Sequence, residues 1–193
     1  MKKMDYQHII DKYYPEENEL RRILMVHSRG VADKALRIVD AHPELSLDRS
    51  FVEEAAMLHD IGIFRCNAPG IQCFGEAPYI CHGHEGAELL RREGYPRHAR
   101  VCERHTGAGL TVAEIRQQAL PLEIPPCPAG VSPQAWEPFL PETLEEQLIC
   151  YADKFFSKTR PEQEKTFAQA ERSLMKFGEE GVRRFQSWKE MFE

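Results

Sequence analysis

The 193-residue sequence contains no long apolar run, no closely paired cysteines and no excess of basic residues. None of its apolar stretches approaches the roughly 20 residues that a membrane-spanning helix needs, so we expect no membrane association. The N-terminal segment becomes polar at once and lacks the apolar core of a signal peptide. The six cysteines form no Cys-x-x-Cys pair. Reduced thiols in a cytoplasmic protein are the simplest interpretation.

The charge balance restricts the class of partner. A formal net charge of −6 argues against a large nucleic-acid interface, because such an interface requires a basic stripe. The same charge is compatible with a small phosphorylated substrate, since bound metal ions can reverse the local field. We therefore expect a small-molecule partner and no nucleic acid.

The sequence also lacks clear strand alternation and internal repeats, whereas apolar residues recur at helical spacing along most of the chain. Apolar residues make up 42% of it, which is enough for one buried core. We therefore predict an all-α fold, a compact single-domain helical bundle. The predicted helices span residues 5–14, 16–41, 48–62, 82–93, 96–105, 111–118, 143–158 and 161–177, followed by an amphipathic tail at 182–192 that should pack on the protein's own core.

Two long segments break the helical periodicity. Residues 64–80 contain several turn-forming residues, and residues 119–141 contain seven prolines. Loops of this length are often lids or binding loops, so both segments are candidate substrate lids, and simple surface connection is the alternative for each. Trp136 and Phe139 favour packing of the second segment back on the domain.

The stretch from Phe51 to Cys66 carries a histidine on its apolar helix face. Starting at Val52, apolar residues and His59 recur at helical spacing, and the carboxylate of Asp60 follows directly. Burying an unpaired polar group costs about 2–7 kcal/mol, so such a pair needs a partner, and a metal ion would supply one. The alternative is a hydrogen-bonded core histidine beside a surface aspartate.

Other helical positions offer similar ligands. His27 shares the apolar face of its predicted helix with Leu24 and Val31. Imidazoles and carboxylates without paired thiolates suit Fe, Mn, Co, Ni or Zn rather than a structural zinc finger. Their number is adequate for a site with two cations that share a hydroxide and clamp a phosphoryl group. The candidate ligands are His27, His59, Asp60, His82 or His84, His105 and Asp153.

The order and context of these residues resemble those of a known family. His27 is followed by His59-Asp60-Ile61-Gly62, His82-Gly83-x-x-Gly86-Ala87, His105-Thr106-Gly107 and Ala152-Asp153-Lys154. This series resembles the HD-domain phosphohydrolase superfamily, in particular the branch with two additional histidines between the HD pair and the final aspartate. The resemblance covers about residues 20–160. It implies a single α-helical domain over 1–193, with 119–141 as an insertion and 161–193 as a helical extension.

The resemblance also implies a ligand set. One metal would be bound by His27, His59 and Asp153, the second by His82 and His105, and Asp60 would contact both. His82 fits the family's spacing to Gly86-Ala87, and His84 is the fallback, with an exposed helix position or a supporting role near the ligands as its alternative. The histidines outside the series are predicted to be surface residues; they are His8, His42 and His98.

The activity implied is metal-dependent hydrolysis of a phosphoester or phosphoanhydride in a small nucleotide-like substrate. One or two transition-metal ions, iron first among them, would lower the pKa of a shared water, and the resulting hydroxide would attack phosphorus. Asp60 and Lys154 are the predicted catalytic residues. Cations near the metals would neutralise the phosphoryl oxygens, and Lys154 leads those candidates before Arg65, Arg104 and Arg160.

Two other functions stay open at this point. A few HD-fold proteins use the same ligands to hold a mixed-valent di-iron centre that oxygenates its substrate. A non-catalytic regulatory domain that senses nucleotides or binds proteins could also keep the metal for stability. The family context resembles the dinucleoside-tetraphosphate hydrolases, but the insertion before Ala152 departs from them and leaves the substrate undefined. We expect a monomer or a homodimer.

Overall fold

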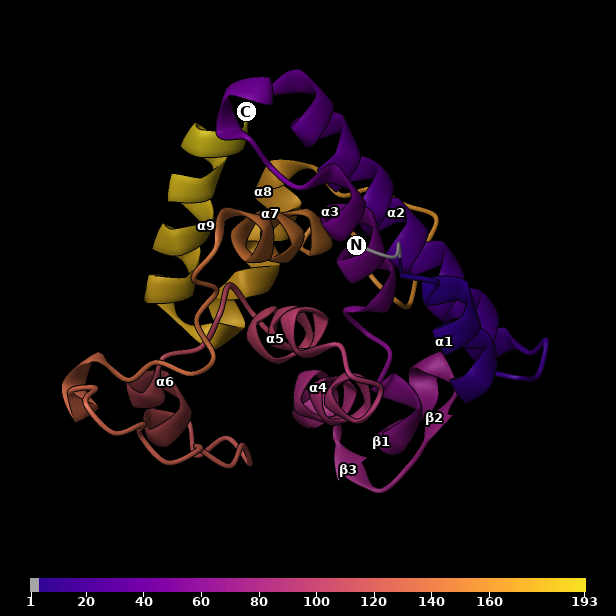
Figure 1. Ribbon diagram of the computed structural model, residues 1–193, viewed down its shortest axis with the longest axis horizontal. Helices are drawn as coiled ribbons and strands as arrows, with labels where there is room; N and C mark the ends of the chain where they lie inside the picture. Colours follow the sequence, from indigo (N-terminus) through magenta and orange to yellow (C-terminus); the bar gives the residue numbers. More distant parts are fainter. Residues whose placement is uncertain (1–3) are drawn as a thin grey trace.

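The computed structural model describes residues 4–193, and helices dominate that range, which confirms the predicted all-α class (Figure 1). The α-helices are α1 (Tyr6–Tyr13), α2 (Glu19–Ala41), α3 (Arg49–Leu58), α4 (His82–Arg92), α5 (Pro96–Arg104), α6 (Val112–Gln117), α7 (Leu144–Asp153), α8 (Phe167–Leu174) and α9 (Glu179–Phe192). The strands are β1 (Cys66–Ala68), β2 (Cys73–Phe74) and β3 (Ala77–Pro78). Short 3₁₀ turns lie at Pro43–Leu45, Ile63–Arg65, Pro69–Ile71, Tyr79–Cys81, Pro133–Ala135 and Met175–Phe177.

Side-chain caps explain where several helices begin. The carboxylate of Asp48 accepts a hydrogen bond from the backbone N–H of Phe51 at the start of α3. Thr143 and Glu146 form the predicted capping box at the start of α7, each side chain satisfying a backbone N–H of the other. These caps satisfy N–H groups that have no partner within the first helical turn, so local sequence sets these boundaries.

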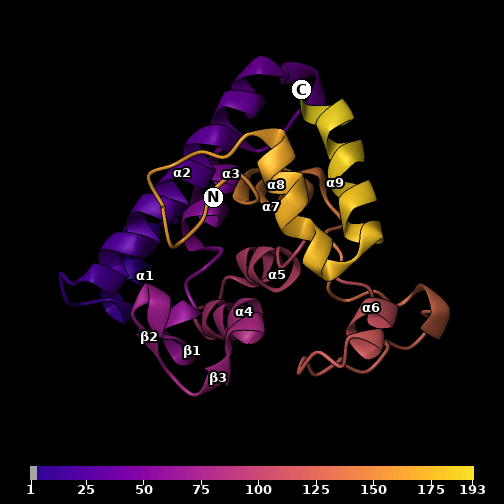
Figure 2. The same ribbon diagram turned by 180° about the vertical axis from the view of Figure 1, so that it is seen from behind.

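Helix α7 lies in the middle of the molecule. The pair α2 and α3 covers one side of it, α5 and α4 lie below it, and α8 and α9 cover the remaining side (Figure 1). From behind, α8 crosses in front of α7, and the chain between α7 and α8 extends across α2 (Figure 2). Buried side chains from all the α-helices except α6 form one continuous hydrophobic core, and α6 packs in a smaller cluster beside it.

The C-terminal tail packs on the protein's own core, as predicted. Phe185 is fully buried, with its ring centroid 5.0 Å from that of Tyr151 on α7. Phe167 on α8 stacks on the opposite side, with a centroid distance of 4.8 Å to Phe185. Val182, Trp188 and Phe192 of α9 are buried as well. This aromatic cluster holds α8 and α9 against α7. It therefore also fixes the position of residues 154–166, which connect α7 to α8.

Three predicted helix ends are wrong, and each has a local cause. Helix α3 ends at Leu58 rather than near residue 62, because the backbone then tightens into three-residue turns. Helix α7 ends at Asp153 for the same reason, with Phe156 N–H bonded to the Asp153 carbonyl. Helix α8 begins after Thr166, which caps it, and not at Pro161.

The small sheet within residues 64–80 was not predicted. Strand β1 pairs with β2 in antiparallel fashion and with β3 in parallel fashion. Strands of two or three residues are too short for an alternating pattern to show.

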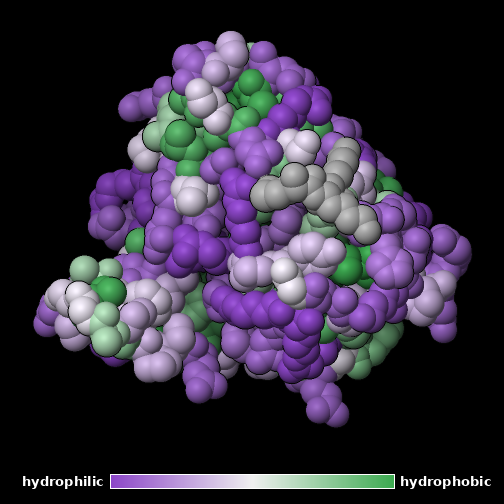
Figure 3. Space-filling view, viewed as in Figure 1, coloured by the Kyte–Doolittle hydropathy of each residue, from purple (hydrophilic) through white to green (hydrophobic). Residues whose placement is uncertain are grey.

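Residues 119–141 form a lobe beside the body of the molecule, at the lower left in Figure 1. In Figure 3 this lobe is less hydrophilic than most of the face on which it lies. Phe139 anchors that lobe by packing against Leu110 and Ile115.

His98 is not a surface residue, and that prediction is wrong. Its side chain is buried between α5 and α3, with its ring centroid 4.9 Å from that of Phe51 and its Nε2 3.3 Å from a carboxylate oxygen of Glu54. Burial lowers the pKa of His98 to about 4, so it is neutral at pH 7. His8 is exposed, as expected, and His42 is partly exposed.

None of the helices in the described range, 4–193, is both long and apolar enough to cross a membrane.

The turn after α3 depends on a close backbone approach at Gly62. A Cβ atom at this position would lie 2.2 Å from the Gly86 nitrogen and 2.5 Å from the His82 carbonyl oxygen, both on α4. Backbone atoms cannot rotate away as a side chain would. Glycine at position 62 therefore lets the segment that carries His59 and Asp60 rest directly on α4.

We expect Gly62→Ala to lower the free energy of unfolding by about 1–3 kcal/mol, because the new methyl group forces the turn away from α4. Urea denaturation followed by circular dichroism measures this. Gly70→Ala is the matched control, since a Cβ at Gly70 meets no atom within 4 Å, and it should leave the midpoint unchanged. Equal midpoints for the two variants would contradict the close approach.

Candidate metal centre

The predicted ligands converge at the ends of helices. His59 and Asp60 follow the last residue of α3, His105 follows α5, and Asp153 is the last residue of α7. His82 opens α4, whereas His27 lies in the middle of α2. Two successive residues within a helix face different directions. The tight turns after α3 instead bring the neighbours His59 and Asp60 to the same buried site.

The gathered side chains form two clusters that share Asp60. The first holds His27, His59, Asp60 and Asp153, and the second holds Asp60, His82 and His105. Oδ2 of Asp60 lies 2.9 Å from Nε2 of His27 and 3.0 Å from Nε2 of His59. Its other oxygen, Oδ1, lies 3.3 Å from Nε2 of both His82 and His105. Each oxygen of Asp60 thus faces a different cluster. His84 belongs to neither.

One local arrangement recurs at three of the histidines. Nδ1 of His59, His82 and His105 bonds the carbonyl oxygen three residues earlier, at Ala56, Tyr79 and Cys102, over 2.6, 2.7 and 2.7 Å. A carbonyl only accepts, so Nδ1 donates, and in a neutral ring Nε2 then carries the lone pair. Metal-binding histidines use such a bond to fix the ring, with the other nitrogen free for the ion.

The lone pairs of His82 and His105 lie too close together to coexist without a positive charge between them. Nε2 of His82 is 3.0 Å from Nε2 of His105, and Nε2 of His27 is 3.3 Å from Nε2 of His59. Ligand atoms around an ion at about 2.1 Å lie roughly 3.0 to 3.4 Å apart in octahedral and tetrahedral sites. Both oxygens of Asp60 are buried, and in the described range only the imidazole nitrogens of the two clusters and the ammonium group of Lys158 lie within ion-pair distance of them. The donor set therefore fits transition-metal ions.

The field at the site favours positive charge. Burial alone would make His59 harder to protonate, but Asp60 and Asp153 outweigh it and raise the pKa of His59 to about 9. Burial would also raise the pKa of both carboxyl groups, yet His59 holds that of Asp60, and Lys154 that of Asp153, well below the usual range. Burial lowers the pKa of His82 to about 3 and keeps its ring neutral.

The helix dipoles add to this field. The carboxyl ends of α3, α5 and α7 meet at the clusters, and each such end carries the equivalent of about half a negative charge. Cations are stabilised near such ends. A site for metal cations therefore follows from the arrangement of helices as well as from the ligand atoms.

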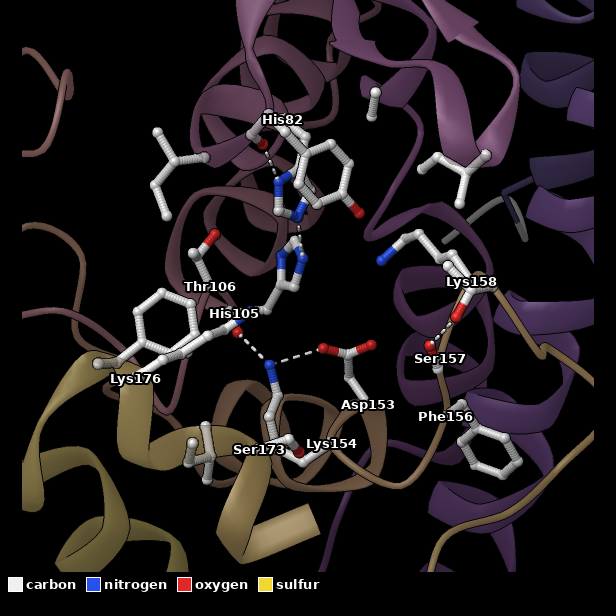
Figure 4. Close-up of a pocket in the computed structure, with 18 of the residues that line it drawn as sticks. His82, His105, Thr106, Asp153, Lys154, Phe156, Ser157, Lys158, Ser173 and Lys176 are labelled. Atoms are coloured by element: carbon white, nitrogen blue, oxygen red, sulfur yellow. Dashed lines mark hydrogen bonds and ion pairs between the residues drawn. The ribbon is translucent and has the colours of Figure 1, made fainter. Parts of the chain in front are cut away.

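A cavity of about 640 Å³ opens beside the clusters and is lined by His82, His105 and Asp153 (Figure 4). The sheet segment forms one wall through Ala68, Gly70, Ile71, Tyr79 and Ile80, whereas the lobe at 119–141 contributes Leu120. Of the two candidate lids, residues 64–80 contact the cavity broadly and residues 119–141 hardly do.

The predicted catalytic Lys154 lines this cavity, but its ammonium group is already held. Its Nζ lies 2.7 Å from Oδ2 of Asp153 and donates to the carbonyl oxygen of His105 over 2.9 Å (Figure 4). The other predicted cations lie elsewhere. Arg65 pairs with Glu85, Arg104 is buried against Glu142 and Glu146, and Arg160 is exposed outside the cavity lining.

Lys158 was missed by the sequence analysis. Its Nζ lies 2.6 Å from Oδ2 of Asp60 and points toward the cavity beside the ligand clusters (Figure 4). Burial opposes the charge on Lys158, but Asp60 outweighs it and raises the pKa of the ammonium group. The only signal in the sequence is its position four residues after Lys154, which would place both lysines on one face of a helix. Because α7 ends at Asp153, this spacing does not predict where Lys158 lies.

Comparison with known proteins identifies the family. The model of the HD domain matches residues 24–157, which include the ligands of both clusters. The chain belongs to the HD domain family.

Individual relatives carry other names. A protein named tRNA (cytidine(56)-2'-O)-methyltransferase from Picrophilus torridus is 31% identical over 159 residues, covering 77% of this chain and 38% of that protein. Its namesake from Thermoplasma volcanium is 31% identical over 135 residues, covering 69% and 32%. An uncharacterized protein from Methanocaldococcus jannaschii is 32% identical over 143 residues, covering 69% and 70%. The chain thus spans about a third of the length of each of these two relatives. No solved structure matches it.

His82→Ala should remove one metal ion per chain, and Asp60→Ala both, because Asp60 alone contributes to both clusters. Plasma mass spectrometry of protein purified without chelator measures the content, which we expect to be about two transition-metal ions in the unaltered protein.

His84→Ala is the matched control for His82→Ala. The side chain of His84 is 37% exposed and lies 3.6 Å from Glu88, so its removal should leave the metal content unchanged. Loss of metal from His84→Ala, or full metal content in Asp60→Ala, would show that the ligands are assigned wrongly.

Proposed function

We propose that this HD-domain protein is a metal-dependent phosphohydrolase that cleaves a phosphoester or phosphoanhydride bond in a small nucleotide-like substrate. The observation that carries the proposal is the combination of two His/Asp clusters sharing Asp60 with a lysine-lined cavity directly beside them. The clusters suit paired cations, and the lysines suit the anionic oxygens of a phosphoryl group.

The cavity carries a local charge opposite to that of the whole chain. Four lysines line it, at positions 154, 158, 165 and 176, and Asp153 is the only carboxylate among its lining residues. The full sequence has a net charge of −6. A basic cavity in an acidic protein attracts anions locally. Its volume of about 640 Å³ lies within the usual range for small-molecule sites.

Each side chain has a definite part in this scheme. His27, His59, Asp60 and Asp153 would hold one ion, and Asp60, His82 and His105 the other. When bound, such ions supply a nucleophilic hydroxide at neutral pH and polarise the phosphoryl oxygens. Lys158 faces the cavity beside Asp60 and neutralises charge on the phosphoryl group. Lys154 holds Asp153 and the His105 carbonyl in place, so we assign it a positioning role.

Methyl transfer to tRNA is the competing proposal, because it is the activity in the names of two relatives. Those names describe whole proteins, of which the matched segments make up 38% and 32%. The matched segment here contains the metal-type clusters, and methyl transfer makes no use of a hydroxide-forming metal pair. We therefore expect no transfer of radioactivity from methyl-labelled S-adenosylmethionine to tRNA.

A panel of nucleoside mono-, di- and triphosphates and dinucleoside polyphosphates tests the proposal. We expect the metal-loaded protein to release phosphate or nucleotide from at least one of them, and His105→Ala to lose this activity by about 100-fold or more. Phosphate assay and anion-exchange chromatography measure the products. His84→Ala is the control and should stay active.

Two outcomes would reject the hydrolase. One is the absence of turnover on the whole panel by protein that holds both metals, which would favour a regulatory domain. The other is activity that disappears when dioxygen is removed, which would favour a di-iron oxygenase on the same scaffold. Hydrolysis requires water but no dioxygen, so the proposed reaction should proceed equally well in an anaerobic chamber.

Lys158→Gln should lower kcat by about 100-fold with unchanged metal content, because it removes a cation that faces the reacting group. Steady-state kinetics on the substrate found in the panel measures this loss. Arg160→Gln removes a nearby positive charge outside the cavity lining and should keep kcat within about twofold. Equal effects of the two substitutions would contradict the role of Lys158.

A further inference from the structure

Three of the cavity lysines lie beyond the segment that matches the HD family, which ends at residue 157; they are Lys158, Lys165 and Lys176. Lys165 precedes α8 and Lys176 lies in the turn that follows it. Both line the same cavity as His82, His105 and Asp153. The aromatic packing of α8 and α9 on α7 holds them there. The C-terminal extension therefore completes the cavity.

Lys165 and Lys176 differ from the other two lysines in having no acidic partner. Lys154 pairs with Asp153 and Lys158 with Asp60, at 2.7 and 2.6 Å. Within residues 4–193, no carboxylate oxygen lies within ion-pair distance of Lys165 or Lys176. The Nζ of Lys165 instead donates to the Ser173 hydroxyl and to the Lys154 carbonyl, each over 3.4 Å. Both ammonium groups thus face the cavity without an ion pair. Asp153 acts on Lys165 only from beyond ion-pair distance, and Nζ of Lys176 lies 4.9 Å from the ring centroid of Phe177.

These charges repel each other and their neighbours. Burial lowers the pKa of both Lys165 and Lys176, and the nearby Lys154 and Lys158 lower it further, whereas Asp153 partly offsets this effect at Lys165. Gathering ammonium groups without ion pairs in a cavity destabilises the protein unless a bound anion offsets the repulsion. Most other basic side chains of the described part form ion pairs, and those that do not, at positions 116, 160, 172 and 189, lie outside the cavity lining. The grouping of Lys165 and Lys176 in one cavity points to an anionic ligand group.

The position of the two lysines indicates that this anionic group is not the one at the metal centre. Lys158 and Lys176 reach toward the cavity from opposite sides, with His105 and Asp153 between them (Figure 4). The apolar side chains of Ile80, Leu120 and Phe177 also line the cavity. A ligand that fits has an uncharged body and two separated anionic ends.

We propose that Lys165 and Lys176 bind a second phosphate group of the substrate, separate from the one that is hydrolysed. The substrate class is then a nucleotide with at least two phosphate groups. This inference rests on the proposed function for the identity of the reacting phosphate, but the second site itself binds phosphate whether or not hydrolysis occurs. The two lysines determine specificity and take no part in the bond cleavage.

The kinetic test compares adenosine 3′,5′-bisphosphate, whose two phosphates lie apart on the ribose, with adenosine 5′-monophosphate on the full chain. In the double variant Lys165→Gln/Lys176→Gln we expect KM for the bisphosphate to rise by about 10-fold or more. Its KM for the monophosphate and all kcat values should stay within about twofold. The control Lys189→Gln removes an exposed charge of the same extension, outside the cavity lining, and should change nothing.

An equilibrium test separates this inference from the proposed activity. Calorimetric titration of the full chain, treated with chelator, should show at least about 10-fold tighter binding of the bisphosphate than of the monophosphate. The double variant should lose this preference. If no compound is hydrolysed but the preference and its loss are observed, the second phosphate site stands and the hydrolase fails. An unchanged preference in the double variant, or equal weakening of both ligands, overturns the second site.

Discussion

The structure depends on one electrostatic constraint, which is the crowding of imidazole nitrogens around the buried carboxylate of Asp60. Three rings donate through Nδ1 to a carbonyl three residues earlier, and this bond directs each Nε2 toward the same small volume. Among the described residues, only imidazole nitrogens and the ammonium group of Lys158 lie within ion-pair distance of the carboxylate at the centre. A buried group of acceptors of this kind is stabilised by positive charge, so the donor set suits metal cations.

This constraint explains why the ligands lie at helix ends. A helix end supplies a free carbonyl for the imidazole N–H, a negative dipole for the cation, and a turn that can bring successive side chains to one place. It also requires unusually close backbone contacts between elements. Gly62 allows the turn after α3 to approach α4, and Gly83 allows α4 to approach α5, where a Cβ would lie 2.3 Å from the Cys102 carbonyl oxygen. At Gly62 and Gly83, near the histidines, any side chain would therefore clash with the backbone of the neighbouring element.

Much of the fold could be predicted from the sequence, because helical periodicity and caps are local signals. The ligand positions on separate helices were also predictable, but only through the order of short motifs. Helical periodicity could not show which of two neighbouring histidines faces inward, and only the spacing to Gly86-Ala87 favoured His82. In the structure His82 opens α4 against Tyr79, whereas His84 is turned toward Glu88. Nor could the sequence show Lys158 or the burial of His98, since both depend on contacts between elements distant along the chain.

The distribution of charge divides the molecule into two functional parts. The segment that matches the HD family holds the carboxylates and imidazoles, which form a negative centre for cations. The residues after it hold Lys158, Lys165 and Lys176, which place positive charge along the same cavity. A phosphorylated ligand needs both, because cations act on the reacting phosphorus while lysines compensate the remaining anionic groups. In the proposed scheme the clusters bind metal and the lysines bind phosphate, so the extension can alter the preferred substrate while the metal centre remains unchanged.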